Sequence, residues 1–317
     1  MKLVTFATAA HPERVGALIG DRGVFDLTAA ALGAAPFESM RALIDAGETA
    51  WQTAAGLVTT ENPDFILGTG DWRLRAPLPR PKQFRDSMCF DRHIEQASRG
   101  MIALRARLAG DTDAMPPASL DLPPIYTQQP VWYKGNRLNV SDPGADIQWP
   151  PFSAYADFEL ELACIIGCAG RDIAPDRALE HVFGYTIFND FSARDVQAIE
   201  TQGFLGPAKG KDFDGANVFG PCIVTADEID DPNDLRMVAR VNGEVWCDGS
   251  SSTMNFSMAE LIAYISRGET LHPGEVIGSG TIGDGCGLEH MRFLKSGDVV
   301  ELEVEKIGRL TNRVVFS

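Results

Sequence analysis

The chain has 317 residues, of which 44% are hydrophobic and 23% charged, and its formal net charge is −16. These proportions are typical of a globular protein that builds one or two domains without disulfide or metal staples. The negative charge, with no run of Lys or Arg, disfavours nucleic acids and anionic membranes as partners. No apolar run approaches the ~20 residues that cross a bilayer, and the six cysteines lack CxxC spacing. We therefore expect a cytoplasmic protein with reduced thiols.

The first part of the chain predicts a small domain. Alternating apolar residues predict strands at 2–7 and within 14–28, and a helical pattern follows that ends at Gly47. Three prolines then fall between residues 77 and 81, which is typical of a linker. We therefore expect two domains, a small N-terminal β/α domain over residues 1–75 and a larger domain over residues 76–317.

The second domain begins with a helix and continues mainly with short strands. Residues 91–110 have helical periodicity, and the Pro-rich segment that follows, up to residue 126, is a predicted loop that could cover a site. Short apolar runs separated by Gly, Pro, Asp and Asn then predict strands, among them a hairpin with Asn242–Gly243 as its turn. One helix interrupts these strands, and Ser257 with Glu260 predicts a capping box at its start.

The Gly-rich segment 278–287 is expected to be a loop. It follows a predicted strand, but neither a helix nor an acidic residue at dinucleotide spacing comes after it, so a Rossmann or P-loop interpretation fails. The predicted strands do not alternate regularly with helices, which disfavours a doubly wound sheet. The predicted fold class is therefore α+β and β-rich, with a barrel, roll or sandwich as the larger domain.

Three carboxylates occupy every second position at the start of the predicted strand DFELELACIIG, residues 157–167. Side chains at i and i+2 of a strand point the same way, so Asp157, Glu159 and Glu161 share one face. A solvated face explains the same pattern in ELEVE at 301–305 and is the simplest interpretation here too. However, this face turns apolar directly after Glu161, and carboxylates that enter an apolar region need a partner such as a divalent cation. Glu159 and Glu161 are thus candidate ligands, and Asp157 is expected behind them or on the solvated face.

A third acidic residue comes from the segment GYTIFNDFSARDVQ, residues 184–197. Asp190 lies where a predicted strand turns into a helix, although Asp at such a turn is often only an N-cap. Arg194 and Gln197, three residues apart in the first helical turn, would present a guanidinium and an amide in one direction. This pair suits a carboxylate or a keto acid, and the simpler alternative is a solvated Arg194 paired with Asp195.

Five segments, in order along the chain, resemble the fumarylacetoacetate hydrolase family. They are DSMCFDRH, DFELELA, NDFSARDVQ, GPAKGKDFD and GSGTIGDGCGLE, of which NDFSARDVQ and GPAKGKDF are the most specific. The resemblance implies a set of metal ligands, namely Asp86, Glu159, Glu161 and Asp190. It implies a set of catalytic residues, namely His93, Glu289, Lys211, Arg194 and Gln197. It also implies a set of substrate contacts, namely Tyr133, Thr281, Met88, Arg194 and Gln197.

The same resemblance implies a fold and a reaction. The fold is a mixed β-roll or barrel-like catalytic domain with a small N-terminal domain, and the assembly is a homodimer. The reaction is hydrolysis of a carbon–carbon bond in a β-diketo acid, an acylpyruvate or a fumarylacetoacetate-like substrate, in the breakdown of aromatic or sugar acids. Met88 and Thr201 stand where fumarylacetoacetate-specific members have substrate-contacting tyrosines, so the resemblance predicts the reaction class and leaves the acyl group open.

The implied site has a consistent chemistry. Four carboxylates without Cys or His are hard oxygen ligands, which select Mg²⁺, Ca²⁺ or Mn²⁺. Such a cation chelates a diketone and stabilises the departing enolate, with Lys211, Arg194 and Gln197 around the developing charge. His93 would draw a proton from water and Glu289 would orient it, although His93 in DRHIEQASRG is on its own typical of a surface histidine.

Other functions stay open on the sequence. A 2-oxo acid decarboxylase, isomerase or hydratase would use the same cation and enolate without an activated water, and the presence of both His93 and Glu289 favours hydrolysis. A non-catalytic β protein that binds a metal or ligand would explain the acidic residues. It would leave Lys211, Arg194, Gln197 and the His93–Glu289 pair without a role.

Overall fold

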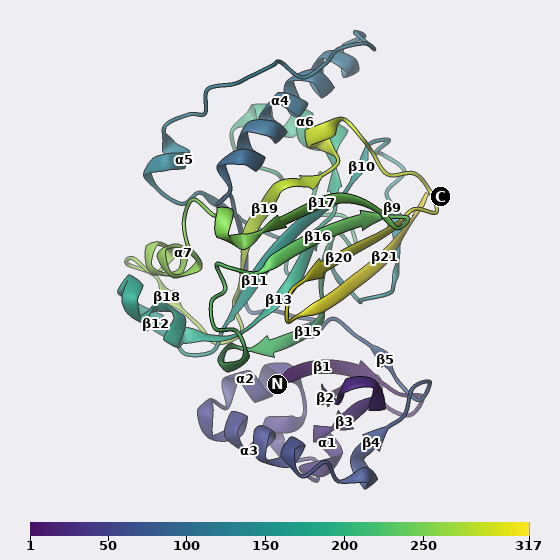
Figure 1. Ribbon diagram of the computed structural model, residues 1–317, viewed down its shortest axis with the longest axis vertical. Coiled ribbons are helices and arrows are strands. Elements are labelled where there is room, and N and C mark those ends of the chain that lie inside the picture. Colours follow the sequence, from purple (N-terminus) through teal and green to yellow (C-terminus); the bar gives the residue numbers. More distant parts are fainter. Residues whose placement is uncertain (317) are drawn as a thin grey trace.

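Twelve strands from both halves of the chain form one mixed sheet in the computed structural model, which describes residues 1–316 (Figure 1). The sheet's main path is β4-β3-β2-β1-β15-β13-β11-β19-β6-β7, with β5 beside β1 and β8 beside β15. Neighbours are antiparallel except the parallel pairs β19·β6 and β15·β8. The strands are β1 (Lys2–Ala7), β2 (Arg14–Leu18), β3 (Val24–Asp26), β4 (Ile66–Leu67), β5 (Arg73–Leu74), β6 (Phe84–Ser87), β7 (Trp132–Lys134), β8 (Val140–Ser141), β11 (Glu159–Ile166), β13 (Val182–Asp190), β15 (Asn217–Thr225) and β19 (Val276–Cys286).

A second sheet packs in front of the first in the half of the molecule that lies away from β1 to β5 (Figure 1). Its order is β17-β16-β20-β21-β9, and its strands are β9 (Asp146–Trp149), β16 (Arg236–Val241), β17 (Glu244–Ser250), β20 (Val299–Val304) and β21 (Gly308–Phe316). Two short pairs complete the strands, β10 (Ala156–Asp157) with β14 (Ser192–Ala193) and β12 (Gly170–Arg171) with β18 (Thr270–Leu271). The mixture of antiparallel and parallel pairs confirms a β-rich α+β fold and not a doubly wound sheet.

The helices lie at the two ends of the molecule and along one side (Figure 1). They are α1 (Leu27–Ala30), α2 (Met40–Asp45), α3 (Glu48–Thr59), α4 (Asp91–Leu108), α5 (Ile125–Gln128), α6 (Arg194–Glu200) and α7 (Met258–Ile265). Helices α1 to α3 lie beside strands β1 to β4, whereas α4 and α6 pack on each other at the opposite end of the molecule. Because α4 follows β6 and α6 follows β13 and β14, both helices start next to the part of the large sheet that β13, β11, β19 and β6 form.

Local predictions hold where the sequence carries a turn or cap signal. The helix expected at 91–110 is α4, and the hairpin at Asn242–Gly243 joins β16 to β17 with positive φ at both turn residues. Ser257 and Glu260 form both bonds of the capping box at the start of α7. That helix ends at Ile265, three residues before the left-handed Gly268.

The loop predicted at 278–287 is wrong, because these residues form most of β19. The strand pairs with β11 on one side and β6 on the other. Its glycines are there for space: a Cβ on Gly278 would lie 2.6 Å from Asp86 Oδ1, and one on Gly280 would lie 2.2 Å from the carbonyl oxygen of Ser87. Glycine inside a strand thus marks a close approach of other groups, and it does not mark a loop.

The two strands with alternating carboxylates have different surroundings. In β20 exposure alternates along the strand, so the solvated-face interpretation at 301–305 is confirmed. In β11 every residue is buried, because β13 and β19 flank it and the second sheet packs on one of its faces. Glu159 and Glu161 therefore lie in the protein interior, and an ordinary solvated face is wrong for them.

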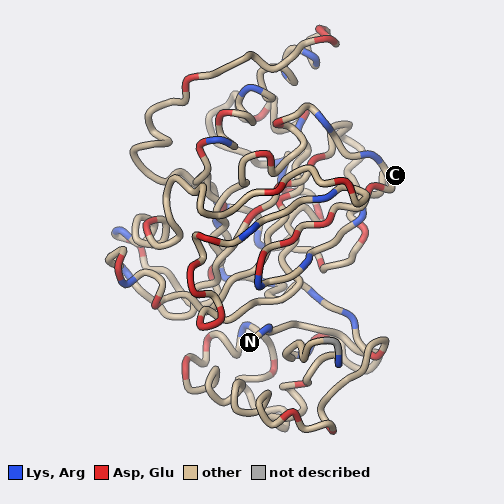
Figure 2. Tube along the Cα trace, in the orientation of Figure 1, with Lys and Arg blue, Asp and Glu red and all other residues tan. Residues whose placement is uncertain are grey.

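The small N-terminal unit hydrogen-bonds to the rest of the chain through β1, which pairs with β15. The domain boundary near residue 75 stays a prediction. Figure 2 shows Lys and Arg scattered among Asp and Glu along the trace. Within residues 1–316, no helix is both long and apolar enough to cross a membrane.

Candidate active site

Four buried carboxylates meet on the large sheet, near the ends of three of its strands. They come from β6, β11 and β13, and each offers an oxygen within 4.8 Å of the others; they are Asp86, Glu159, Glu161 and Asp190. The parallel pairing of β6 with β19 brings Asp86 beside Glu161, and the pairing of β11 with β13 brings Asp190 to the end of the same face. The structure thus brings together all four of the residues that the resemblance implies as ligands.

Two basic side chains, Lys211 and Arg194, form ion pairs with this carboxylate cluster. Lys211 Nζ lies 2.5 Å from Glu159 Oε2 and also bonds Asp190 Oδ2. Arg194 Nη2 lies 2.7 Å from Glu159 Oε1, while its Nε donates to Asp157 over 2.7 Å. The alternative of a solvated Arg194 paired with Asp195 is therefore wrong, since the Arg194 side chain is only 2% exposed.

The carboxyl groups of the cluster differ in their pKa. Burial raises the pKa of Glu159, but Lys211 and Arg194 outweigh burial and hold that pKa well below its usual range. Burial raises the pKa of Asp190 to about 7 although Lys211 opposes it. Burial, and then the neighbouring Asp86 carboxyl, raise the pKa of Glu161 well above its ordinary value. Two carboxyls so close in the interior cannot both ionise without a further positive charge.

The residues fit a divalent cation on two observations. Neither Asp86 nor Glu161 has an ion pair in residues 1–316, although both are buried. Asp190 Oδ1 is buried and has no hydrogen-bond partner in this described part of the chain. Carboxylate oxygens are the ligands that Mg²⁺, Ca²⁺ and Mn²⁺ prefer, and a cation here would satisfy both the charge and the orphan oxygen.

A thermal-shift experiment tests this fit without any assay of activity. Mg²⁺ or Mn²⁺ at a hundredfold excess over its dissociation constant should stabilise the folded protein by about 2.7 kcal/mol and raise the unfolding midpoint. The shift should disappear in Glu161→Gln and persist in Glu38→Gln, whose exposed carboxylate lies in the N-terminal unit. An equal shift in both variants would place the cation elsewhere.

Gly278 makes the space that the cluster needs. A Cβ at this position would lie 2.6 Å from Asp86 Oδ1 and 3.0 Å from Glu161 Oε2. We expect Gly278→Ala to push these two carboxylates apart and to weaken divalent-metal binding about tenfold or more, measured by titration calorimetry. Gly56→Ala is the control, since a Cβ there meets nothing within 4 Å. Unchanged metal affinity in Gly278→Ala would contradict the assignment of these ligands.

His93 and Glu289 form a second buried pair beside the cluster. His93 Nδ1 lies 2.9 Å from Glu289 Oε1, and the other oxygen of Glu289 accepts the backbone N–H of Cys286 over 3.0 Å. His93 projects from the first turn of α4 and is 6% exposed, so the surface-histidine alternative is wrong. A carboxylate on Nδ1 fixes the ring orientation and the tautomer, which leaves Nε2 as the free nitrogen.

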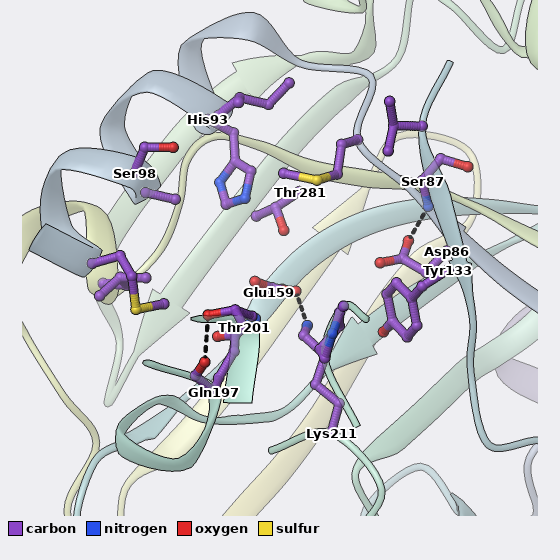
Figure 3. A pocket seen from close by; sticks show the side chains of 18 of the residues that line it. Asp86, Ser87, His93, Ser98, Tyr133, Glu159, Gln197, Thr201, Lys211 and Thr281 are labelled. Carbon is purple, nitrogen blue, oxygen red and sulfur yellow. Dashed lines mark hydrogen bonds and ion pairs between the residues drawn. The ribbon is translucent and has the colours of Figure 1, made fainter. Parts of the chain in front are cut away.

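The carboxylate cluster and His93 face one pocket of about 740 Å³, which lies between α4, α6 and the loop after α6. Figure 3 shows His93 on one wall of this pocket, with Tyr133 and Lys211 across from it and Glu159 between. Apart from Asp190 and Glu289, every residue implied for the site lines the pocket, including Met88, Gln197 and Thr281. The size is that of a cavity for a small organic ligand.

Several of these side chains are held by one another. Tyr133 Oη donates to Asp190 over 2.7 Å, and Thr281 Oγ1 donates to Glu161 over 3.2 Å. Arg194 Nη1 donates to the Gln197 side-chain oxygen over 2.9 Å, which leaves the Gln197 amide N–H groups for a ligand. Bonds within the protein thus position these side chains.

Of the two positions expected for Asp157, the one behind Glu159 and Glu161 is confirmed and the solvated one is wrong, because the residue is completely buried and pairs with Arg194, which contacts Glu159. Its carboxylate accepts the backbone N–H groups of Gly287 and Leu288 over 2.7 and 2.9 Å, in addition to its ion pair with Arg194. Asp157 therefore links Arg194 to the short segment that contains Glu289. No local sequence pattern predicts this link, because the connected residues are far apart in the chain.

The chain belongs to the fumarylacetoacetate hydrolase family. The family model described as fumarylacetoacetate (FAA) hydrolase C-terminal matches residues 84–315. Oxaloacetate tautomerase YisK of Bacillus subtilis is 34% identical over 251 residues, which cover 79% of this chain and 75% of that protein. A mitochondrial oxaloacetate tautomerase of Xenopus laevis is 32% identical over 99% of this chain and 90% of its own length.

Solved structures agree with this assignment. The fumarylacetoacetate hydrolase of Exiguobacterium antarcticum superposes with a TM-score of 0.76 at 29% identity, and the match covers all of both chains. A maleylpyruvate hydrolase of a Sphingobium species, solved with manganese(II) and pyruvate, superposes with a TM-score of 0.73 at 22% identity, again over both whole chains. The second likeness shows a shared fold, and its ligands are those of that protein.

Proposed function

We propose that this chain is an enzyme that forms or consumes the enol of a 2-oxo acid, with His93 as the group that moves the proton. The observation that carries the proposal is the His93–Glu289 pair, 2.9 Å apart, which opens onto the pocket that also contains the carboxylate cluster. Family membership supports an enzyme, but the relatives have names for different net reactions.

The cation proposed for Asp86, Glu159, Glu161 and Asp190 would polarise the substrate's carbonyl and stabilise negative charge on its oxygen. Lys211 and Arg194 hold Glu159 in its ionised form beside that position. The free amide N–H groups of Gln197 face the same pocket and suit a carboxylate or carbonyl oxygen of the substrate.

His93 is supported as the base by its bond to Glu289. The carboxylate accepts a hydrogen bond from the N–H at Nδ1, so Nε2 carries the lone pair on the side of the pocket. When Nε2 takes up a proton, the adjacent carboxylate stabilises the imidazolium. The same geometry serves two reactions, since the proton can come from the carbon next to a carbonyl or from a water molecule.

Keto–enol tautomerisation is the net reaction that sequence relatives support. Curated relatives from a bacterium, a frog and mammals are named oxaloacetate tautomerases, at 32–38% identity. In this reaction His93 would remove a proton from the carbon next to the carbonyl and deliver it to the oxygen of the resulting enolate, or carry out the reverse transfer, with no water consumed.

Hydrolysis of a carbon–carbon bond in a β-diketo acid, the reaction predicted from the sequence, is the second candidate. The size of the pocket, about 740 Å³, favours it, because that volume exceeds what a four-carbon acid fills. Here His93 would take a proton from water, the resulting hydroxide would add to the acyl carbonyl, and the enolate that departs would be protonated.

One pair of assays separates the two reactions. The first assay follows the loss of enol absorbance from oxaloacetate, and the second follows the loss of diketone absorbance from a panel of acylpyruvates. Each is run with Mg²⁺ or Mn²⁺ and again after addition of chelator. Only tautomerisation leaves the carbon skeleton whole, so product analysis by NMR identifies which reaction occurs. If neither oxaloacetate nor any acylpyruvate reacts in a chelator-sensitive way, the proposed function is wrong.

The homodimer, the cytoplasmic location and the catabolic pathway stay predictions. The family resemblance is what implies the dimer, and at least one relative is mitochondrial. Light scattering after size-exclusion chromatography measures the mass in solution, which should be twice the 34.4 kDa of one chain.

A further inference from the structure

A second group of metal-ligating side chains lies beside the carboxylate cluster, and its ligand atoms are of a different kind. His93, Cys286 and Glu289 each offer one ligand atom, and these three atoms lie within 4.8 Å of one another. They come from the first turn of α4, the end of β19 and the short helical turn Leu288–His290. Among the six cysteines, only Cys286 belongs to such a group within residues 1–316. The proton transfer proposed for His93 makes no use of this thiol.

The thiol of Cys286 is buried without a partner. The residue is 1% exposed, and its sulfur makes no hydrogen bond in the described part of the chain, whereas its backbone N–H donates to Glu289 over 3.0 Å. The buried thiols of Cys222 and Cys247, by contrast, each donate to a backbone carbonyl oxygen. An unpartnered sulfur next to a nitrogen and an oxygen ligand is an arrangement that a metal ion completes.

The spacing of the group suits a tetrahedral ion. Zn²⁺ binds sulfur at about 2.3 Å and nitrogen or oxygen at about 2.0–2.2 Å, so two of its ligand atoms lie roughly 3.5 Å apart. The His93 and Glu289 atoms are 2.9 Å apart and the sulfur lies within 4.8 Å of both, so side-chain shifts of about 1 Å close the site. Figure 3 shows His93 on the wall of the pocket, from which an ion and a water molecule as fourth ligand would enter.

The charges of the group balance a divalent ion. Glu289 supplies one negative charge and Cys286, bound as a thiolate, supplies a second, so the complex is neutral. Arg194 also lies near this thiol, but Asp157 and Glu159 balance its charge over 2.7 Å each. A neutral complex avoids the free-energy cost of an isolated charge in the interior.

We propose that His93, Cys286 and Glu289 form a second metal site, which binds Zn²⁺ or a similar thiophilic ion and inhibits the enzyme. When the ion binds, the S–H bond breaks, its proton leaves to solvent, and the sulfur's electron pair forms the bond to the metal; nothing is oxidised or reduced. Thiolate and imidazole ligands select Zn²⁺, whereas Mg²⁺ and Ca²⁺ prefer the oxygen ligands of the carboxylate cluster. Excess Mg²⁺ should therefore fill the cluster and leave this site to Zn²⁺.

Inhibition follows whichever ring nitrogen of His93 the ion takes. An ion on Nε2 occupies the lone pair that would accept the proton. An ion on Nδ1 displaces the N–H there, and the neutral imidazole then carries its proton on Nε2. The base is lost in both cases. This inhibition rests on the proposed function, whereas the binding of the metal does not.

Absorption spectroscopy of Co²⁺ in excess Mg²⁺ tests the binding without an activity assay. A thiolate ligand gives Co²⁺ an intense sulfur-to-metal charge-transfer band, which oxygen and nitrogen ligands do not give. The wild-type protein should show this band with one equivalent of Co²⁺, and Zn²⁺ should displace it. Cys286→Ser should lose the band and bind Zn²⁺ about a hundredfold more weakly or worse, measured by calorimetry. Cys168→Ser is the control, since Cys168 is the exposed cysteine.

The outcomes for the metal site are distinct. Absence of the band from the wild-type protein overturns the proposal, and this measurement needs no variant to fold. Loss of the band in Cys168→Ser, or its persistence in folded Cys286→Ser, also overturns it, because the ion would then sit on another thiol. The band without turnover of any 2-oxo acid would instead refute the proposed function and leave the metal site standing.

Rates test the inhibition separately. With Mg²⁺ in excess, saturating Zn²⁺ should slow the wild-type protein by more than about tenfold, because it removes the base. Cys286→Ser should be slowed much less, each protein being compared with itself in the absence of Zn²⁺. Equal inhibition of the two proteins would overturn the inhibitory role of this site.

Discussion

His93→Asn is expected to lower kcat by about a thousandfold with little change in the unfolding midpoint, because the variant removes the proposed base. Asn keeps a polar side chain beside Glu289 but cannot accept a proton at neutral pH. Initial rates on whichever 2-oxo acid the wild-type protein uses provide the measurement. His11→Asn is the control, since His11 is exposed in the N-terminal unit.

Glu289→Gln extends this test. The amide can still bond the imidazole, but it no longer stabilises the imidazolium by charge, so the loss in kcat should be intermediate. A full rate in His93→Asn would remove His93 from the mechanism, whatever the net reaction is.

Lys211→Met should have the largest effect on stability. Lys211 is 4% exposed and bridges two buried carboxylates, Glu159 and Asp190, so its loss leaves uncompensated negative charge in the interior. Removing one partner of a buried ion pair costs about 3–5 kcal/mol, and we expect the free energy of unfolding in chelator to fall by that amount. Denaturant titration measures it.

The same variant also reports on the cation. Because a divalent ion would restore positive charge to the cluster, Mg²⁺ should recover a larger part of the stability of Lys211→Met than it adds to the wild-type protein. Lys209→Met is the matched control, two residues earlier in the same loop and exposed to solvent. A loss of stability that is the same with and without Mg²⁺ would contradict a shared site.

Three members of the carboxylate cluster could be predicted because their signals are local. Glu159 and Glu161 alternate in a strand that turns apolar, and Asp190 lies at a strand end before Arg194. Strand geometry alone left a solvated face as the simplest interpretation, and the family resemblance decided between the two. The structure supplies the physical reason: β11 lies between two strands and under a second layer, so its carboxylates are buried and face only the pocket.

Other features depend on distant parts of the chain and could not be predicted locally. Asp157 acts through Arg194 and the backbone of Gly287 and Leu288, more than 30 residues away in either case. The glycines of 278–287 predict a loop by composition, but they are there because Asp86, Glu161 and Ser87 approach that backbone closely. Cys286 has no sequence signal either, since only the fold brings its thiol beside His93.

In both proposed reactions His93 would move the proton, while the carboxylate cluster would hold a cation that stabilises the enolate. Exchange of solvent deuterium into the carbon next to the substrate's carbonyl, followed by NMR, tests this step for tautomerisation, and deuterium in the released 2-oxo acid tests it for hydrolysis. The account predicts exchange with Mg²⁺ or Mn²⁺ that stops in chelator and is slowed about a thousandfold in His93→Asn. Exchange that continues in chelator, or that proceeds at the full rate without His93, would contradict it.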